Sequence, residues 1–217
     1  MAPIYRPKSD KEFFAPFGPT MGYFRMPEAL VAELNNAMSQ SLSDHSDHLV
    51  GKVRQELAFD QHAVEIAGRS LSQVVCEYHA WSKRRHLLGA TTGEQLALNL
   101  EIVSGWFVRQ FEGEYNPLHM HTGCTLSCVG YLNLPDGIEK EWDEDYKDHH
   151  PSHGHIQFAH GTDTWYSFSN FMAKPRVGDF YIFPSFLFHC VYPFKTPGER
   201  RSFSMNMVVH EQKNAQG

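Results

Sequence analysis

The chain has 217 residues; 41% of them are hydrophobic, and 16 are phenylalanines. This length and composition predict a single domain with a sizeable core. The formal net charge of −6 argues against a protein that binds nucleic acid through a broad basic surface. No apolar stretch approaches the length that spans a bilayer, so we expect no membrane segment.

The start of the chain and its cysteines indicate a cellular location. Residues Met1–Arg6 lack the apolar segment of a signal peptide, so we expect a cytoplasmic protein whose four cysteines are reduced thiols. Cys124 and Cys128 have a Cys-x3-Cys spacing. A thiolate zinc site usually needs a second cysteine pair, so a zinc site there is a weak alternative. The sequence leaves the oligomeric state open, with a homodimer as one possibility.

The first half of the chain predicts helices after a short extended segment. A first helix is expected from Pro27 to about Leu42, and residues 48–59 fit either a continuation of this helix or a loop. The clearest helix covers about residues 61–85, where one apolar stripe recurs at alternating steps of three and four. Its members are Val64, Ala67, Leu71, Val74, Tyr78 and Trp81. Residues 1–94 are therefore interpreted as an extended segment and bracing helices, part of the same domain as the rest.

From Gln95 onward the hydrophobic pattern has a period of two, which is typical of strands. Short strands are expected at residues 98–110, 119–122, 125–134, 155–159, 164–168, 180–183, 187–192 and 200–209. Helices followed by such strands predict a mainly β fold with N-terminal helices. We interpret residues 95–217 as a double-stranded β-helix, the cupin-like jelly roll, with the helices covering one sheet.

Two features of the strand region allow more than one interpretation. The insertion Asp136–Ser152 carries six acidic residues, and it fits either a solvated loop or a lid over a site. A cluster of five histidines overlaps and follows it, but the irregular spacing favours surface residues over a second metal site. These are His149, His150, His153, His155 and His160.

Three other histidines predict a metal site. His119 and His121 are two residues apart in an expected strand, so they project from the same face. His189 lies in another expected strand and can complete a triangle of imidazoles. Imidazole suits Fe, Zn, Cu or Ni, and three histidines also describe a hydrolytic zinc site with an open position.

A second group follows the last of these histidines. Arg200 and Ser202 share one face of the final strand with Ser204 and Asn206. A guanidinium and a hydroxyl that face the same space as a metal suit a bound carboxylate. This pairing favours an oxygenase with a dicarboxylate co-substrate over a zinc hydrolase.

The motifs His119-x-His121, His189 and Arg200-x-Ser202, with the run Gly178–Ser185 before His189, resemble the 2-oxoglutarate and Fe(II)-dependent oxygenase superfamily. In particular the chain is similar to the uncharacterised "putative 2OG-Fe(II) oxygenase" group of marine bacteria and phages. The resemblance covers about residues 95–209, and it implies a dioxygenase that uses Fe(II), 2-oxoglutarate and O2 and releases succinate and CO2.

The resemblance also implies roles for individual residues. His119, His121 and His189 would bind the iron, and Arg200 with Ser202 would bind the C5 carboxylate of 2-oxoglutarate. Tyr131, expected to face inward, is a further candidate contact to the co-substrate, with Gln110 and Asn206 as weaker ones. Phe183, Phe186 and Phe188 flank His189 and are candidates for the pocket wall, although two of the three are expected to be ordinary core.

The second histidine departs from the pattern of the superfamily, which usually has His-x-Asp or His-x-Glu. Three-histidine iron sites occur in cupin dioxygenases that use no 2-oxoglutarate, so an enzyme of that kind is the first alternative. A jelly roll that binds a metal or ligand without catalysis is the second. It is also open whether His121 binds the metal directly. The primary substrate is not indicated by any motif.

Overall fold

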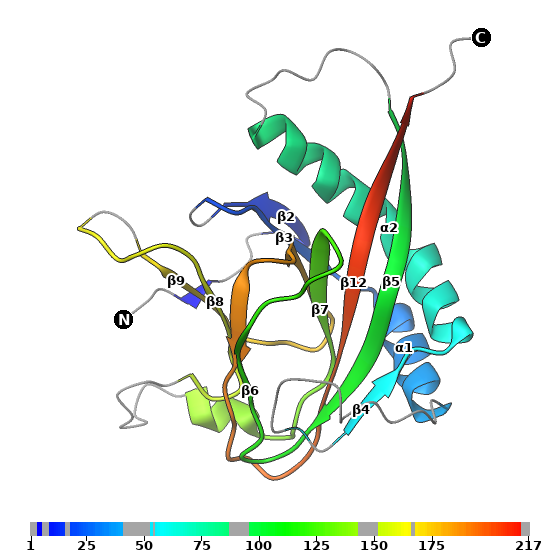
Figure 1. The fold of residues 1–217 in the computed structure, drawn as a ribbon. Helices are drawn as coiled ribbons and strands as arrows, with labels where there is room; N and C mark the ends of the chain where they lie inside the picture. The colour runs from blue at the N-terminus through cyan, green and yellow to red at the C-terminus, as the bar shows by residue number, and fades with distance from the viewer. Residues whose placement is uncertain are drawn as a thin grey trace.

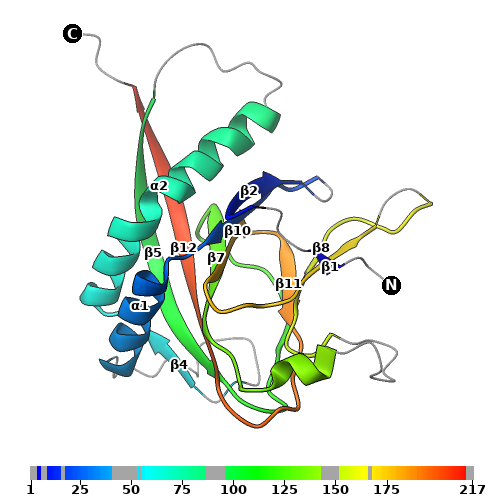
Figure 2. The same ribbon diagram turned by 180° about the vertical axis from the view of Figure 1, so that it is seen from behind.

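The computed structural model describes residues 4–5, 9–15, 18–40, 53, 55–86, 96–142, 152–165 and 168–213. Two helices lie against the outer face of a large sheet, and a smaller sheet lies on its other side (Figures 1 and 2). Of the acidic insertion, residues 143–151 lie outside the described residues, as do His149 and His150. The structure therefore does not test the lid.

The two helices occur where the hydrophobic spacing predicts them. Helix α1 is Glu28–Gln40 and helix α2 is Gln61–His86. Asp60 begins α2, because its carboxylate accepts a 2.8 Å hydrogen bond from the backbone N–H of Ala63. Both helices turn their apolar stripes toward the large sheet, where Leu34, Leu71 and Val75 are fully buried.

The large sheet has seven strands among the described residues, in the order β2-β3-β10-β7-β12-β5-β4. They are β2 (Lys11–Phe14), β3 (Met21–Arg25), β10 (Asp179–Pro184), β7 (Leu126–Asn133), β12 (Arg200–Lys213), β5 (Leu96–Gln110) and β4 (Gln55–Ala58). The central pair is β5 with β12, which align antiparallel from Gln110 opposite Arg200 to Leu96 opposite Lys213. Strand β4 corrects the expectation of a helix or loop over residues 48–59 at residues 55–58, whereas residues 48–52 and 54 lie outside the described residues.

The small sheet has five strands among the described residues, in the order β1-β9-β8-β11-β6. They are β1 (Ile4–Tyr5), β9 (Asn170–Ala173), β8 (Ile156–Ala159), β11 (Phe188–Val191) and β6 (Asn116–His119). Residues 166–167 of the strand expected at 164–168 lie outside the described residues, and the next strand that the structure describes after β8 is β9. The strand expected at 119–122 is wrong, because β6 ends at His119 and leaves His121 beyond the ladder.

The core has two layers, one on each face of the large sheet. Phe107, Phe180 and Phe203 pack against the helices, and Val129, Tyr131 and Phe183 pack against the small sheet. Every residue of β7 from Leu126 to Leu132 is buried, because both of its faces are covered. This arrangement of two facing, mainly antiparallel sheets is the expected jelly roll.

The N-terminal part is built into the same sheets. Strand β3 pairs with β10, β4 pairs with β5, and β1 pairs in parallel with β9. Neither described helix combines the length and the apolar character that a membrane span requires.

Candidate functional site

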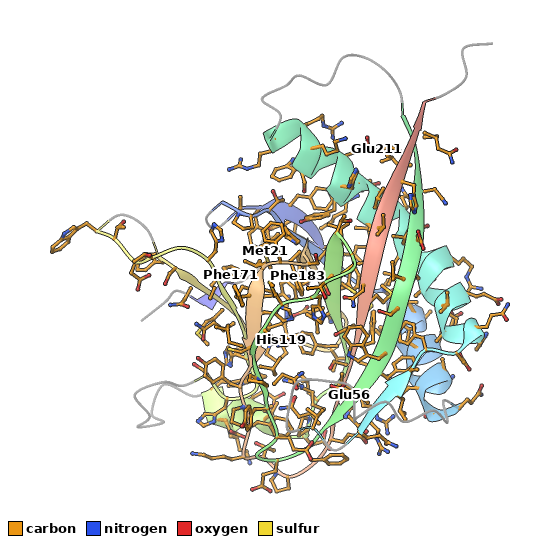
Figure 3. All side chains as sticks on the ribbon, viewed as in Figure 1. Met21, Glu56, His119, Phe171, Phe183 and Glu211 are labelled. Carbon is orange, nitrogen blue, oxygen red and sulfur yellow. The ribbon has the colours of Figure 1, made fainter. Side chains whose placement is uncertain are left out.

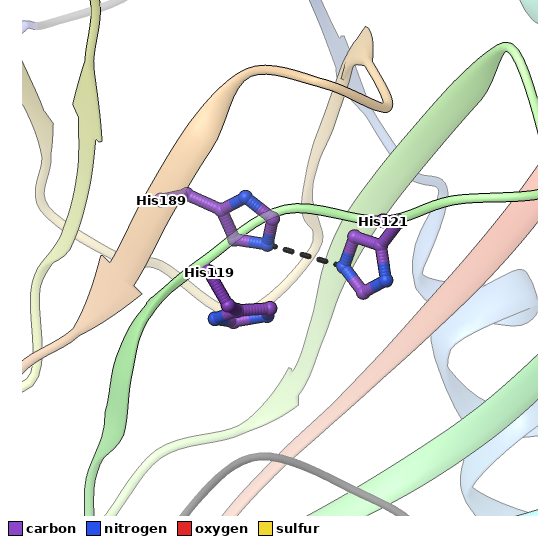
Figure 4. Close-up of side chains that lie close together, drawn as sticks. All are labelled: His119, His121 and His189. Carbon is purple, nitrogen blue, oxygen red and sulfur yellow. Dashed lines mark hydrogen bonds between the residues drawn. The ribbon is translucent and has the colours of Figure 1, made fainter.

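Three imidazoles converge at the edge of the small sheet. His119 ends β6, and His189 lies opposite it in the neighbouring strand β11. His121 follows β6, where its backbone N–H donates to the carbonyl of Ser185 in the turn before β11. One ligand nitrogen from each ring lies within 4.8 Å of the others, and the three rings face one another (Figure 4).

Backbone carbonyls orient two of these rings. The Nδ1 atoms of His119 and His189 lie 2.7 Å and 2.9 Å from the carbonyl oxygens of Pro117 and Leu187, two residues earlier in each case. Each Nδ1 therefore carries the proton and donates it, which leaves the lone pair of Nε2 for another partner. The Nε2 atoms of His121 and His189 are 3.3 Å apart. This separation suits two ligands of one ion at metal–nitrogen distances of about 2.1 Å.

The surroundings keep the imidazoles of His121 and His189 neutral. Burial, followed by the charge of His119, lowers the pKa of His121 to about 4. The same causes lower the pKa of His189 to about 3. Neutral imidazole is the form that binds a metal, so the donor set of the site fits a divalent transition metal.

Arg200 and Ser202 lie on the inner face of the large sheet and line the same cavity as the three histidines. The cavity has a volume of about 110 Å³, and Val129, Ile156, Phe183 and Val191 supply its apolar wall. The residues that the sequence assigns to a metal and to a carboxylate thus share one enclosed space, although they come from opposite sheets.

Arg200 is held from both sides. Its Nη1 atom donates to the carbonyl of Gly154 at 3.0 Å, and its Nη2 atom donates to the side-chain oxygen of Gln110. The amide of Gln110 in turn donates to the carbonyl of Glu114. The guanidinium is almost completely buried, yet its Nε atom has no hydrogen-bond partner.

Tyr131 faces inward as the alternation of β7 predicts. It is fully buried, and the centre of its ring lies 5.8 Å from the Cζ atom of Arg200. Burial raises the pKa of its phenol to about 12, so the phenol remains protonated, and its hydroxyl has no hydrogen-bond partner. Two buried donors, Nε of Arg200 and the hydroxyl of Tyr131, therefore lack an acceptor.

The weaker sequence candidates have mixed outcomes. Gln110 contacts Arg200, whereas Asn206 accepts a hydrogen bond from Ser127 and does not line the cavity. Phe183 lines the cavity, but Phe186 and Phe188 are 58% and 45% exposed, do not line this cavity and do not belong to the core.

The structure also tests the alternative of a thiolate zinc site and the expectation that the five-histidine cluster lies on the surface. All four cysteines are free, and none joins the metal-binding group formed by the described residues. The expectation of surface residues is wrong for His153 and His155, which are buried, His155 fully so beside Trp142, whereas His160 is exposed.

Sequence reasoning missed three polar or aromatic residues of the cavity, namely Glu56, Trp106 and Asn116. Trp106 was recognised only as part of a strand; its ring centre lies 5.6 Å from that of His121. The position of Trp106 on the inner face of β5 could have indicated its place. Glu56 carried no such signal, because its strand was not recognised.

Comparison with known proteins gives one family match. Residues 104–206 match the model of the family described as "Putative 2OG-Fe(II) oxygenase". No curated protein matches the chain. The match does not bear on a marine bacterial or phage grouping, which stays a prediction.

Solved structures with low similarity include two enzymes and one metal complex. A prolyl-4-hydroxylase from Pseudomonas putida is 16% identical, with a TM-score of 0.48 over 96% of this chain and 95% of that one. A 2OG-Fe(II) oxygenase family oxidoreductase from Burkholderia pseudomallei is 13% identical, with a TM-score of 0.47 over 85% and 83%. HygX from Streptomyces hygroscopicus, solved with nickel and 2-oxoglutarate bound, is 11% identical, with a TM-score of 0.49 over 86% and 82%.

The assignment depends on the family match and on the site, not on these distant likenesses. The matched segment contains all three histidines together with Arg200 and Ser202. The segment 104–206 therefore belongs to the 2OG-Fe(II) oxygenases, enzymes whose cofactors are Fe(II) and 2-oxoglutarate.

Proposed function

We propose that the protein is a dioxygenase that hydroxylates an organic substrate, with His119, His121 and His189 as the ligands of Fe(II). The observation that carries the proposal is the shared cavity, which is lined by three imidazoles and by a buried guanidinium and hydroxyl. His121 is included as a direct ligand because its Nε2 faces that of His189 at 3.3 Å.

Arg200 and Ser202 bind the C5 carboxylate of 2-oxoglutarate in this proposal, and Tyr131 adds its hydroxyl. The support is the pair of buried donors without an acceptor, Nε of Arg200 and the hydroxyl of Tyr131. A buried donor without an acceptor costs free energy, which a bound carboxylate would recover. The 2-oxo acid end then faces the histidines across the cavity.

Bound Fe(II), with 2-oxoglutarate and O2, supplies the oxidising power that replaces a substrate C–H bond by C–OH while 2-oxoglutarate becomes succinate and CO2. The chain's own residues bind, orient and exclude water. The carbonyls of Pro117 and Leu187 fix two imidazoles, and Gln110 with Gly154 fixes Arg200. Ile156, Phe183 and Val191 supply apolar wall around the reacting groups.

A three-histidine dioxygenase that does not use 2-oxoglutarate is the second candidate. The observation that favours it is the absence of a carboxylate from the metal-binding group of the described residues. The buried donors beside Arg200 favour the first candidate, because such an enzyme has no dicarboxylate to bind there. A non-catalytic jelly roll would not explain why the three histidines and the buried donors line the same cavity.

The deciding experiment is metal analysis of protein purified without oxygen, followed by titration with 2-oxoglutarate and by assay of succinate after oxygen is admitted. We expect about one iron per chain, a visible absorption band that appears with 2-oxoglutarate, and slow release of succinate even without a primary substrate. Iron without any response to 2-oxoglutarate would support the second candidate. If the protein contained no iron and released no succinate, we would conclude that it is a binding protein.

Three further inferences from the sequence, on domain organisation, location and oligomeric state, remain proposals. Residues 1–94 and 95–217 form one domain, which the pairing of β3 and β4 with the later strands supports. The cytoplasmic location and the homodimer stay predictions.

A further inference from the structure

One wall of the cavity carries charge and aromatic character that the proposed roles do not use. Glu56 and Trp106 lie side by side on the inner face of the large sheet. Glu56 pairs with Val108, and Trp106 is the next inward residue of β5, opposite Ala58. A diagonal pair of this kind in adjacent antiparallel strands is within reach of long and aromatic side chains. Both side chains line the cavity.

Glu56 lies at the edge of the large sheet and faces the cavity. Its strand, β4, is the last strand of the large sheet, and it is level with Ser202 across β5. The neighbouring residue Leu57 faces the helices, so the alternation of the strand turns Glu56 inward. The side chain is 2% exposed. Figure 3 labels Glu56 near β4 and His119 near β6, on the two walls of the site.

The opposite wall adds a second acceptor. Asn116 begins β6, the edge strand of the small sheet, and its side chain lines the same cavity. Its side-chain oxygen is buried and has no hydrogen-bond partner. A carboxylate, an amide oxygen and an indole face are the groups that bind an ammonium or guanidinium group.

The distribution of charge in the cavity points the same way. Among the described lining residues, Arg200 is the one permanent cation and Glu56 the one carboxylate. Arg200 is assigned to the co-substrate, and Glu56 is not part of the metal-binding group. Because a carboxylate offers about four acceptor positions, Glu56 can bind a ligand while keeping other contacts.

We propose that the primary substrate carries an ammonium or guanidinium group, and that Glu56 and Trp106, with the side-chain oxygen of Asn116, bind this group beside the metal centre. The proposal rests on the proposed function, because it takes Arg200 to be occupied by 2-oxoglutarate. It names the charge of the substrate, which no motif indicates.

The test uses the 217-residue protein loaded with Zn²⁺ and 2-oxoglutarate. Zn²⁺ has no redox chemistry, so this complex can bind a substrate without converting it. The probes are N-acetyl-L-lysine amide and N-acetyl-L-norleucine amide, which share a carbon chain and differ in the terminal ammonium group of lysine, and the acetylated and amidated tripeptides Gly-Lys-Gly and Gly-norleucine-Gly. Acetylation and amidation of the ends remove every other charge from the probes. Binding is measured by calorimetry. We expect the parent protein to bind a lysine probe at least about tenfold more tightly than its norleucine partner. The blocked amino acid and the blocked tripeptide distinguish a small molecule from a peptide side chain.

Substitution then assigns the preference to Glu56. In Glu56→Gln we expect the preference for lysine over norleucine to disappear, whereas the same change at the exposed Glu112, Glu112→Gln, should preserve it. The comparison of probes in the parent protein needs no variant, so it stands even if Glu56→Gln fails to fold. Equal or tighter binding of norleucine, binding of neither probe, or an unchanged preference in Glu56→Gln would overturn the proposal.

The outcome is separable from that of the proposed function. The 2-oxoglutarate titration of the parent protein contains no amine and does not involve Glu56. A normal response to 2-oxoglutarate without any lysine preference would remove the cationic substrate and leave the oxygenase intact. A missing response to 2-oxoglutarate would remove the oxygenase itself.

Discussion

At the scale of single residues, Gln110 holds a buried cation in place through a neutral amide. Its side-chain oxygen accepts a hydrogen bond from Nη2 of Arg200, and its NH2 group donates to the carbonyl of Glu114. Gln110 is fully buried. The amide holds the guanidinium by one edge and leaves its charge unneutralised. An ion pair at the same position would neutralise that charge.

Replacing Gln110 by glutamate tests this arrangement. In Gln110→Glu the new carboxylate would pair with Arg200 and compete with the carboxylate of 2-oxoglutarate. We expect the dissociation constant of 2-oxoglutarate, measured by calorimetry on metal-loaded protein without oxygen, to rise at least about tenfold, or about 1.4 kcal/mol. Metal content should not change, because the histidines lie on the other sheet. Gln73→Glu, at an exposed position of α2, is the control. Unchanged affinity in Gln110→Glu would show that Arg200 does not bind the co-substrate.

His155 predicts a dependence of stability on pH. Burial, followed by the nearby charge of Lys174, lowers its pKa from 6.5 to about 4, although a hydrogen bond from its Nδ1 to the carbonyl of His153 opposes the shift. The unfolded chain therefore binds a proton before the folded protein does. The stabilising contribution of the neutral ring is present above pH 6.5 and is lost as the pH falls to about 4.

A shift of this size corresponds to roughly 3 kcal/mol of unfolding free energy between the two ends of that pH window. We expect His155→Phe to have a shallower dependence of unfolding free energy on pH than the parent protein. The measurement is urea denaturation of the metal-free protein at several pH values from 7 to 4. The exposed His62→Gln is the control and should follow the parent curve. Parallel curves for His155→Phe and the parent would contradict the assignment.

At the scale of elements, hydrophobic periodicity predicted the helices and strands whose residues have a regular apolar pattern. Helix α2 was predicted within one residue of its end, because a continuous apolar stripe packs on the sheet. Strand β4 was not predicted, because Glu56 occupies an inward position of Gln55-Glu-Leu-Ala58 and breaks the apolar alternation. Glu56, which breaks the strand pattern, is thus a residue of the cavity. Local sequence patterns often break down at functional sites, and Glu56 fits this rule.

Spacing predicted that the three histidines and Arg200 come together, and they line one cavity, but it did not predict the full geometry. His121 was expected to share a strand with His119. Instead β6 ends first, and the N–H of His121 bonds to Ser185 of a distant turn. A contact over that sequence separation has no local signal, nor does the meeting of β4 with β5 that brings Glu56 to the cavity.

Close packing between strands gives a prediction at this scale. Gly130 of β7 lies opposite Phe203 of β12, and a Cβ atom at Gly130 would lie 2.2 Å from a ring carbon of Phe203. The Phe203 ring is stacked on Phe180, so it has little room to move. We expect Gly130→Ala to lower the unfolding free energy by about 1–3 kcal/mol, the usual cost of overpacking.

A second glycine supplies the matched control. Gly68 lies within α2, and a Cβ atom there would meet nothing within 4 Å. Gly68→Ala should therefore raise the unfolding free energy by about 0.5–1 kcal/mol, because alanine restricts the unfolded chain and favours the helix. Both values come from denaturation in urea at neutral pH. If the two variants changed stability in the same direction, the close approach of Gly130 to Phe203 would be in doubt.

At the scale of the whole molecule, the proposed ligands would connect the two sheets. The small sheet and the segment after β6 supply the three histidines, and the large sheet supplies Arg200 and Ser202. A metal alone would connect β6, β11 and the segment after β6. Metal-bound 2-oxoglutarate would extend that connection across the cavity to β12. Binding to the native state should therefore stabilise the protein in two separable steps.

The two steps can be measured by thermal unfolding without oxygen. We expect Fe(II) to raise the melting temperature of the metal-free protein and 2-oxoglutarate to raise it further only when metal is present. A ligand at 100 times its dissociation constant adds about 2.7 kcal/mol to the unfolding free energy. Arg200→Met should keep the increment from metal and lose the increment from 2-oxoglutarate, and Arg69→Met, at an exposed position of α2, should keep both. A chelator should reverse both increments in the parent. An increment from 2-oxoglutarate that survives in Arg200→Met would mean that the co-substrate does not reach the large sheet, so the metal and the buried guanidinium would act separately.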